Sequence, residues 1–252
     1  MRRQPIASWA SPSANDAGSL TVLGWLTPDE WQAVWLSLVV AGRSVLFGLP
    51  LAVLAALAIV RGRFPGRALL DAVVHLPLVL PPVVVGWGLL LLFGVRGPVG
   101  AWLQDWFGVR LVFTTAGAAL ATAVMAFPLM VRAIRLSLEG VDPGLEAAAR
   151  TLGAGPVDRF VTVTLPLMAP GILAGAVIAF AAGLGEFGAV ITFASSIPGQ
   201  TQTLPLAIYA ATQLPGGEAT AAKLSLVSFT LAIAGLLLSE VIARRMRRLL
   251  GM

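Results

Sequence analysis

Few side chains in this sequence could perform chemistry, and their types exclude several kinds of site. The 252 residues include no cysteine and one histidine, His75, which excludes a cysteine nucleophile, a disulfide and a multi-histidine metal site. The only lysine, Lys223, follows Ala222, whereas a phosphate-binding loop of the Walker A type needs a glycine before its lysine. We therefore expect no ATP site, no metal, no cofactor and no catalytic residue in this chain.

The densest group of polar residues is the stretch EAAARTLGAGPVDRFVTVTLP, which runs from Glu146 to Pro166 between long apolar segments. Just ahead of it, Asp142-Pro143 predicts a helix start, because aspartate caps helix N-termini and proline suits the first helical position. Gly153 predicts the end of that helix, and Pro156 the start of a second one that runs to the closing Leu-Pro. The segment is therefore predicted to be a helix–turn–helix, either a docking element or an ordinary structured loop.

The surrounding composition is that of a polytopic membrane protein. Hydrophobic residues make up 58% and charged residues 12% of the chain, whereas soluble domains carry about 25% charged residues. Five apolar segments are long enough to span a bilayer as helices, so we expect an all-α fold. They run from about Trp31 to Val60, Leu69 to Phe93, Thr115 to Leu136, Leu167 to Phe193 and Leu224 to Ala243.

The arginines are distributed unevenly between the two sets of connecting segments. The first set contains Arg61, Arg63, Arg67, Arg132, Arg135, Arg150, Arg159, Arg244, Arg245, Arg247 and Arg248. The opposite set holds only Arg96, Arg110 and Lys223. By the positive-inside rule the first set is cytoplasmic, which places the C-terminus inside and, with five spans, the N-terminus outside. Because these cations flank apolar runs, the net charge of +5 indicates a membrane partner and no nucleic acid.

We expect three regions along the chain. Residues 1–30 are predicted to be a flexible leader rich in Ser, Ala, Pro and Gly, residues 31–245 one transmembrane domain, and residues 246–252 a short basic cytoplasmic tail. Between the second and third spans, the stretch VGAWLQDWFGV places Trp102, Trp106 and Phe107 near one helical face, which predicts an interfacial helix.

The polar stretch also resembles the signature of ABC importer permeases. That signature reads Glu-Ala-Ala, three residues, Gly, nine residues, an aliphatic residue, one residue and Leu-Pro. We assign it to Glu146, Ala147, Ala148, Gly153, Val163, Leu165 and Pro166. The stretches HLPLVLPPVVVG, LGEFGAVITF and IPGQTQTLP extend the similarity, which is to molybdate permease subunits over residues 29–245. Sulfate and thiosulfate permeases share much of this pattern.

This resemblance implies a type I ABC importer permease fold in the bacterial inner membrane. It implies a homodimer around one pathway, two cytoplasmic ATPase subunits, and an external binding protein that delivers an oxyanion, molybdate or the similar tungstate. The helix–turn–helix would then couple the ATPase to the spans. Glu146 would contact a basic or polar group in a groove of the ATPase, Ala147 and Ala148 would pack into that groove, and Gly153 would permit the turn.

Glu186, in the stretch GLGEFGA, is the first candidate for the pathway. It is predicted near the middle of the fourth span, where a carboxylate is costly and marks a functional site. Since a negative charge would repel an anionic substrate, a structural or gating role is favoured over direct contact with substrate. The neighbouring Gly185, Phe187 and Gly188 are candidates for the same gate.

Arg43, Pro81 and Pro82 are the other pathway candidates. Arg43 could attract an oxyanion, reach the membrane surface or pair with Glu186. The two prolines interrupt the second span, which is tolerable where the freed backbone faces protein or a water-filled cavity, so they indicate either the pathway or a dimer contact. A simple helix kink is the alternative. His75, near the cytoplasmic start of that span, is expected to be an interfacial residue.

Three other functions are weaker interpretations of the same sequence. A sulfate or thiosulfate permease is the nearest competitor. In such systems the binding protein largely selects the oxyanion, so the permease sequence gives little information about the substrate. A secondary transporter would need its own ion-coupling site and no ATPase. An intramembrane enzyme would need a catalytic constellation, and no paired motif for one is visible.

Overall fold

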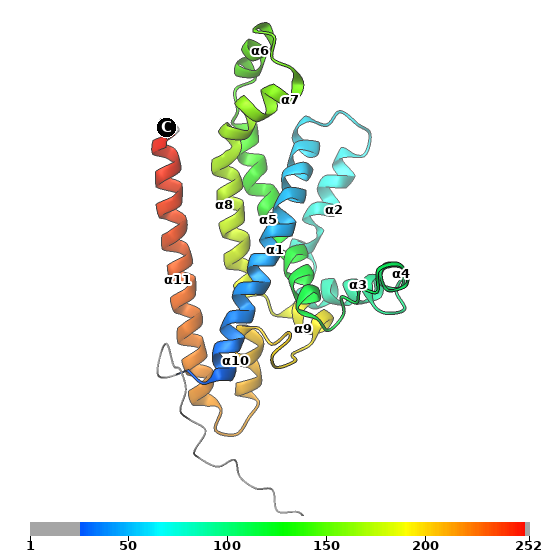
Figure 1. The fold of residues 1–252 in the computed structure, drawn as a ribbon, viewed down its shortest axis with the longest axis vertical. Coiled ribbons are helices and arrows are strands. Elements are labelled where there is room, and N and C mark those ends of the chain that lie inside the picture. Colours follow the sequence, from blue (N-terminus) through cyan, green and yellow to red (C-terminus); the bar gives the residue numbers. More distant parts are fainter. Residues whose placement is uncertain (1–25, 250–252) are drawn as a thin grey trace, which may run out of the picture.

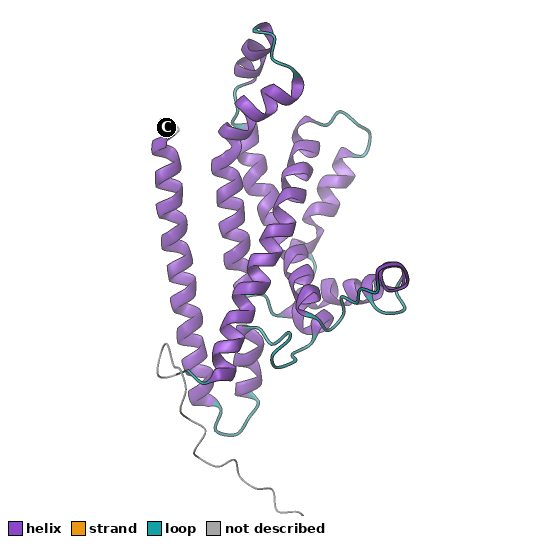
Figure 2. Ribbon diagram, viewed as in Figure 1, coloured by secondary structure: helices purple, strands orange, loops and turns teal. Residues whose placement is uncertain are grey.

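The computed structural model describes residues 26–249, and these are helices joined by loops, with no strand among them (Figure 2). Most of the expected leader, residues 1–25, and the last residues of the expected tail, 250–252, lie outside the described residues. The prediction of an all-α architecture is confirmed for the part of the chain that the structure describes.

The first helix, α1 (Pro28–Arg61), begins ahead of Trp31, the residue where the span was predicted to start. A capping box sets this boundary. The Thr27 hydroxyl accepts a hydrogen bond from the Glu30 amide, and the Glu30 carboxylate accepts one from the Thr27 amide, at 3.3 and 2.7 Å. These bonds satisfy donors that a helix start leaves unpaired. The region expected as leader thus ends inside the first turn of α1.

The second predicted span, Leu69–Phe93, is two helices rather than one. Helix α2 (Arg67–Val79) and helix α3 (Pro82–Phe93) differ in direction by 119°. Pro81 and Pro82 explain the break, because neither has an amide hydrogen to continue the helical ladder. Helix α3 and the following α4 (Pro98–Phe107) extend sideways from the bundle (Figure 1).

Helix α5 (Thr115–Glu139) contains the third predicted span and leads into the polar segment, which forms α6 (Pro143–Thr151) and α7 (Pro156–Arg159). A π-helical turn, η1 (Phe160–Thr164), then joins α7 to α8 (Leu165–Leu184). The run from α7 to α8 forms a single helical stretch that can cross a membrane.

The predicted limits of the fourth span, Leu167–Phe193, are therefore wrong at both ends. Pro166 does not mark an entry to the span, because it lies inside the continuous helical stretch from Pro156 to Leu184, directly after the wider turn η1. At the other end α8 stops at Leu184, and the chain resumes as the short helix α9 (Gly188–Ala194). The helical hydrogen-bond pattern of α8 ends at Gly185, which is the C-cap residue of this helix.

The chain ends with α10 (Leu204–Thr212) and the long α11 (Glu218–Leu249). The fifth predicted span, residues 224–243, lies inside α11, part of whose side chains fall outside the described set. Among the described residues, α1, α5 and the α7–α8 stretch are long and apolar enough to cross a membrane, and the bent pair of α2 and α3 makes up to four such spans.

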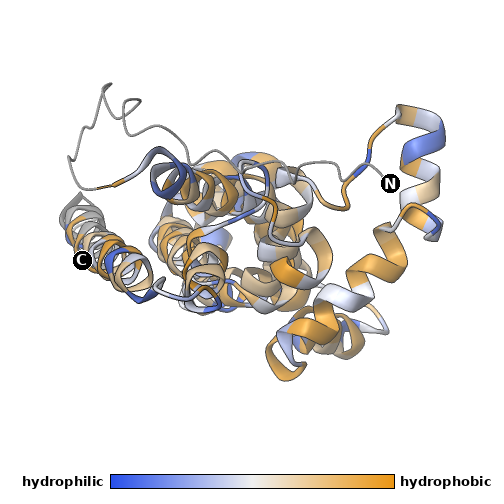
Figure 3. Ribbon diagram, turned by 90° about the horizontal axis from the view of Figure 1, so that it is seen from below, coloured by the Kyte–Doolittle hydropathy of each residue, from blue (hydrophilic) through white to orange (hydrophobic). Residues whose placement is uncertain are grey.

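Helices α1, α5 and α8 pack together as the centre of the molecule, with α11 beside α8 (Figure 1). Small residues permit their close approach: Ala52, Ala56, Ala126 and Ala179 are all buried at these contacts. Apolar residues predominate along the bundle and along α3, whereas α4 mixes apolar and polar residues (Figure 3). Exposed apolar side chains on the helices of a bundle are expected where lipid is the solvent.

The three segments predicted to be cytoplasmic lie at one end of the molecule. The α1–α2 connection, the α6–α7 segment and the end of α11 share this end, and the start of α1 lies at the other (Figure 1). Helix α4 lies beside the bundle (Figure 1); its Trp102 and Trp106 are exposed, and Trp102 packs edge-on against Phe107 with 5.4 Å between ring centroids. The helix is present as predicted, and its position at the membrane interface stays a prediction.

Candidate functional site

The predicted helix–turn–helix is present, and its boundaries follow from its capping residues. The Asp142 carboxylate accepts a hydrogen bond from the Gly144 amide at 2.8 Å, which caps the start of α6. Gly153, at φ +89°, has the left-handed backbone that ends a helix and that few other residues adopt. The segment extends beyond the bundle, at the same end as the α1–α2 connection (Figure 1).

The signature residues divide into an outward group and an inward group. Ala147, Ala148, Gly153 and Pro166 are exposed, whereas Glu146, Val163 and Leu165 are partly buried. The apolar Leu152 and Val157, on either side of the turn, are 88% and 76% exposed. The outer surface of α6 and its turn therefore presents small and apolar residues beside the exposed Arg150, which suits close packing against another protein.

Glu146 lies on the inner side, where it contacts two other parts of the chain. Its Oε1 accepts hydrogen bonds from Arg61 Nη2, at the end of α1, and from the hydroxyl of the fully buried Thr164 in η1. Burial alone would raise the pKa of Glu146. The Thr164 and Arg61 hydrogen bonds, with the charges of Arg61 and Arg159, instead hold that pKa below its ordinary value.

The inward position of Glu146 also corrects the motif assignment. Residues 149–152 separate Ala148 from Gly153, one residue more than the three in the signature. Counting back from Gly153 at the signature's spacing puts Ala147 at the acidic position and Glu146 one residue before it. One residue turns a helix by about 100°, so the exposed alanines and the inward Glu146 occupy different faces of α6.

A second group of predicted residues meets where two helix breaks come together. Helix α3, which starts at Pro82, packs along α9, which starts at Gly188. A Cβ atom on Gly188 would lie 2.7 Å from the Cβ of Pro82, so only glycine allows this approach. The breaks near Pro81 and Gly185 are far apart in the sequence, and the structure makes them neighbours.

Glu186 lies in the α8–α9 break, so its predicted position in the middle of a continuous span is wrong. Its Oε1 accepts a hydrogen bond from the Ala189 amide at 2.9 Å, which caps the start of α9. The reason is local: the chain leaves the helical path at Gly185, and the next acidic side chain satisfies the new helix end. Phe187, in the same break, stacks edge-on against Tyr209 of α10 at 5.2 Å.

Arg43 is not brought to this group. Its side chain is exposed on α1, and among the described residues the structure records no ion pair between Arg43 and Glu186. Of the roles considered for Arg43, pairing with Glu186 is therefore excluded in this conformation.

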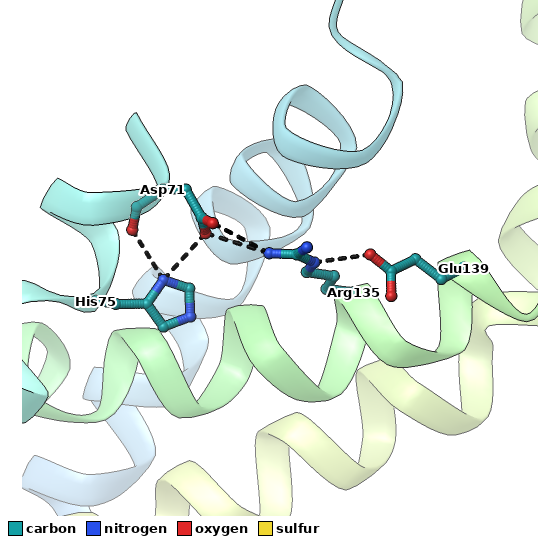
Figure 4. Close-up of polar contacts among 4 residues, drawn as sticks. All are labelled: Asp71, His75, Arg135 and Glu139. Carbon is teal, nitrogen blue, oxygen red and sulfur yellow. Dashed lines mark hydrogen bonds and ion pairs between the residues drawn. The ribbon is translucent and has the colours of Figure 1, made fainter. Parts of the chain in front are cut away.

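One polar cluster was not predicted from the sequence (Figure 4). Asp71 of α2 accepts hydrogen bonds from Arg135 of α5 at 3.2 and 3.3 Å, and the Nδ1 atom of His75 lies 3.1 Å from the Asp71 carboxylate. Arg135 also donates to Glu139 at 2.8 Å. Asp71 and His75, and likewise Arg135 and Glu139, are four residues apart on one helix, and this spacing could have predicted the contact within each pair. The contact between Asp71 and Arg135, which joins the two pairs, depends on the packing of α2 against α5.

Two further contacts, also not predicted, tie α1 to the last part of the chain. Lys223 of α11 forms an ion pair with the buried Glu30 at 2.7 Å. The buried Ser37 hydroxyl accepts a hydrogen bond from the Leu204 amide, the first residue of α10, at 2.6 Å. No cluster of potential metal ligands occurs within residues 26–249.

Comparison with known proteins identifies the class to which this membrane protein belongs. The family model described as "Binding-protein-dependent transport system inner membrane component" matches residues 48–248, and the chain belongs to this family. The chain is a multi-pass membrane protein, and the resemblance recognised in its sequence is confirmed.

The relatives agree with this membership. The molybdenum transport system permease protein ModB of Escherichia coli K12 is 59% identical over 226 residues, covering 90% of this chain and 99% of that protein. ModB of Haemophilus influenzae is 53% identical, over 88% of this chain and 97% of that protein. The sulfate transport system permease protein CysW of Synechocystis is 37% identical, over 85% of this chain and 77% of that protein.

Solved structures show the fold. A bacterial alginate ABC transporter, crystallised with its alginate-bound periplasmic protein, matches with a TM-score of 0.71 over 87% of this chain and 80% of the matched chain. At 20% identity this likeness concerns the fold, and it confirms the expected ABC importer permease architecture.

Proposed function

We propose that this chain is the permease subunit of an ATP-driven importer that carries molybdate, and also tungstate, across the bacterial inner membrane. The observation that carries this proposal is the 59% identity to a molybdenum transport permease along nearly the whole of both chains. The lower identity of the sulfate permease makes sulfate the second candidate.

The chain needs a separate motor for this activity. The residue before Lys223 is alanine, so the Walker A arrangement is absent from the sequence. Two cytoplasmic ATPase subunits would bind the α6–α7 segments of a homodimer. Ala147 and Ala148, which are exposed on α6, would pack into the groove of the ATPase, and Gly153 would set the angle of the turn.

An external oxyanion-binding protein would deliver the substrate at the opposite end of the bundle. This orientation puts the arginine-rich end, with the C-terminus, in the cytoplasm and the N-terminus outside, as the positive-inside rule requires. The exposed apolar faces of the bundle would contact lipid and the second copy of the chain.

The meeting of the two helix breaks is the proposed gate of the pathway. Short helices that end in the membrane leave backbone groups that only protein or water can satisfy. Residues Pro81, Pro82, Gly185, Phe187 and Gly188 lie at these breaks, and Glu186 serves as a cap there. Movement of α9 against α3 would open or close the path during alternating access.

Uptake measurements test the substrate. In a strain that lacks this gene, uptake of labelled molybdate should fall to background and return with the wild-type gene, while sulfate uptake stays unchanged. Retention of molybdate uptake in the deletion strain would exclude the proposal. Loss of sulfate uptake alone would establish the second candidate.

Co-purification tests the ATPase partner. The Gly153→Pro variant should lose the ATPase, because proline cannot adopt φ +89°. Gly155→Ala is the matched control in the same turn, since a Cβ atom added there would meet no other atom within 4 Å and its φ is −68°. A wild-type permease that retains no ATPase under any condition would favour a secondary transporter.

A further inference from the structure

Helix α6 is attached to the bundle by few contacts. None of its residues is buried, and its main packing contacts are with the neighbouring α7 and η1. A helix held in this way can slide or tilt when a partner protein pushes on it, because little apolar surface resists the motion.

The inner side of α6 nevertheless carries one polar connection to the bundle. Glu146 accepts hydrogen bonds from Arg61, the last residue of α1, and from Thr164 of η1. The Glu146 carboxylate thus connects three elements that are distant in the sequence, namely α1, α6 and η1. Bonds to an ionised acceptor are the stronger kind of hydrogen bond.

The surroundings of this carboxylate favour a fixed geometry over a loose surface pair. Thr164 is fully buried, and the side chains of Glu146 and Arg61 are 22% and 39% exposed. The π-helical turn at Phe160–Thr164 widens the helix just where the Thr164 hydroxyl meets Glu146. Such turns are rare and frequently occur at functional positions.

We propose that Arg61 is a positioning residue for coupling, which binds Glu146 so that α6 and the cytoplasmic end of α1 move as one unit. This inference rests on the proposed function, because it assigns the route by which a push on α6 reaches a span. Helix α1 packs along both α5 and α8, so displacement of its end is carried into the centre of the bundle.

The proposal differs from a direct contact between Glu146 and the ATPase. If Glu146 served the ATPase, Arg61 would be dispensable. If the internal pair serves coupling, removing either partner should have the same effect, and removing both should be no worse than removing one. A double-mutant cycle separates these cases.

The experiment uses the complete transporter, with ATPase and binding protein, in proteoliposomes. The variants are Arg61→Ala, Glu146→Ala, the double variant and Arg61→Lys, with Arg63→Ala as the matched control. Arg63 lies in the same connection, and the structure records no ion pair between it and another described residue. Transport and ATP hydrolysis are measured together, and amide exchange of residues 143–164 is followed in the permease alone.

We expect each single alanine variant and the double variant to lower molybdate transported per ATP hydrolysed by about tenfold, with the ATPase still bound. Arg61→Lys should recover part of the loss, because an ammonium can replace the charge but not the guanidinium geometry. Amide exchange in α6 should rise in both alanine variants and stay at the wild-type value in Arg63→Ala.

The proposal is overturned if Arg61→Ala matches Arg63→Ala in transport while Glu146→Ala fails, or if the two losses multiply in the double variant. Unchanged amide exchange in α6 of both alanine variants would overturn it as well, without reference to any partner. Failure of the wild-type transporter to import molybdate would instead contradict the proposed function, so the two failures are distinguishable.

Discussion

Pro82 and Gly188 lie in contact although more than a hundred residues separate them in the sequence, and this contact joins the starts of α3 and α9. A Cβ atom on Gly188 would come within 2.7 Å of the Pro82 Cβ and 3.4 Å of the Val83 amide nitrogen. Two helices that each start inside the apolar region thereby support each other at their N-terminal ends.

Gly188→Ala should consequently disturb the gate. A methyl group has no space beside the rigid ring of Pro82, so we expect a loss of about 1–3 kcal/mol in unfolding free energy and a clear decrease in uptake. Thermal unfolding in detergent and molybdate uptake measure the two effects. Gly88→Ala, in the neighbouring helix α3, is the control, since a Cβ atom added there would meet no other atom within 4 Å. Equal behaviour of the two variants would contradict the close packing.

Substitution of Glu186 separates capping from charge. Glu186→Gln keeps an oxygen that can accept the hydrogen bond of the Ala189 amide, so we expect uptake and stability close to wild type. Glu186→Ala removes the acceptor and should cost about 1 kcal/mol, as loss of other helix caps does. Uptake in whole cells and thermal unfolding check both variants. If Glu186→Gln abolished uptake, the negative charge itself would be required and capping alone would be an insufficient account.

Ser37 links α1 to the start of α10, and its removal should be costly. Ser37→Ala leaves the buried Leu204 amide without its acceptor, which should lower the unfolding free energy by about 1–3 kcal/mol. Ser44 offers a matched control on the same helix. It is equally buried, but its hydroxyl donates to Ala41 within α1, so Ser44→Ala strands no amide. Comparable losses in thermal unfolding for both serines would show that side-chain volume is decisive instead.

The link between Glu146 and Arg61 predicts a dependence of stability on pH. The folded-state pKa of Glu146 lies below its ordinary value of 4.5. A lowered carboxyl pKa contributes stability that is present above the unfolded value and is lost as the pH falls through the folded value. The difference in unfolding temperature between wild type and Glu146→Gln should therefore be constant above about pH 4.5 and shrink below it. A difference that grew on acidification would contradict the assigned direction.

Several local features could be predicted from the sequence because their causes lie within a few residues. Asp142 and Gly153 set the limits of α6 through capping and a left-handed turn. The prolines at 81 and 82 interrupt the second span because they lack an amide hydrogen in any surroundings. The uneven arginines likewise indicated which segments share one end of the molecule, since that rule depends on the membrane and not on packing.

Other features required the fold. The sequence placed Glu186 within a span and directed Glu146 toward a partner protein, whereas the structure turns the first into a cap and the second toward Arg61. The cluster of Asp71 and Arg135 escaped prediction for the same reason. Partners in each case come from helices far apart in the chain, and no local propensity specifies which faces of those helices meet.

The sequence by itself thus determined the membrane class and the caps of the cytoplasmic helices, because hydrophobicity, charge and capping act over short distances, whereas five predicted spans compare with up to four among the described residues. Only the tertiary structure decided that the break at Pro82 meets the break at Gly188, and that Glu146 faces the end of α1. Those relationships depend on how α1, α3, α8 and α9 cross, which is set by packing across the whole bundle.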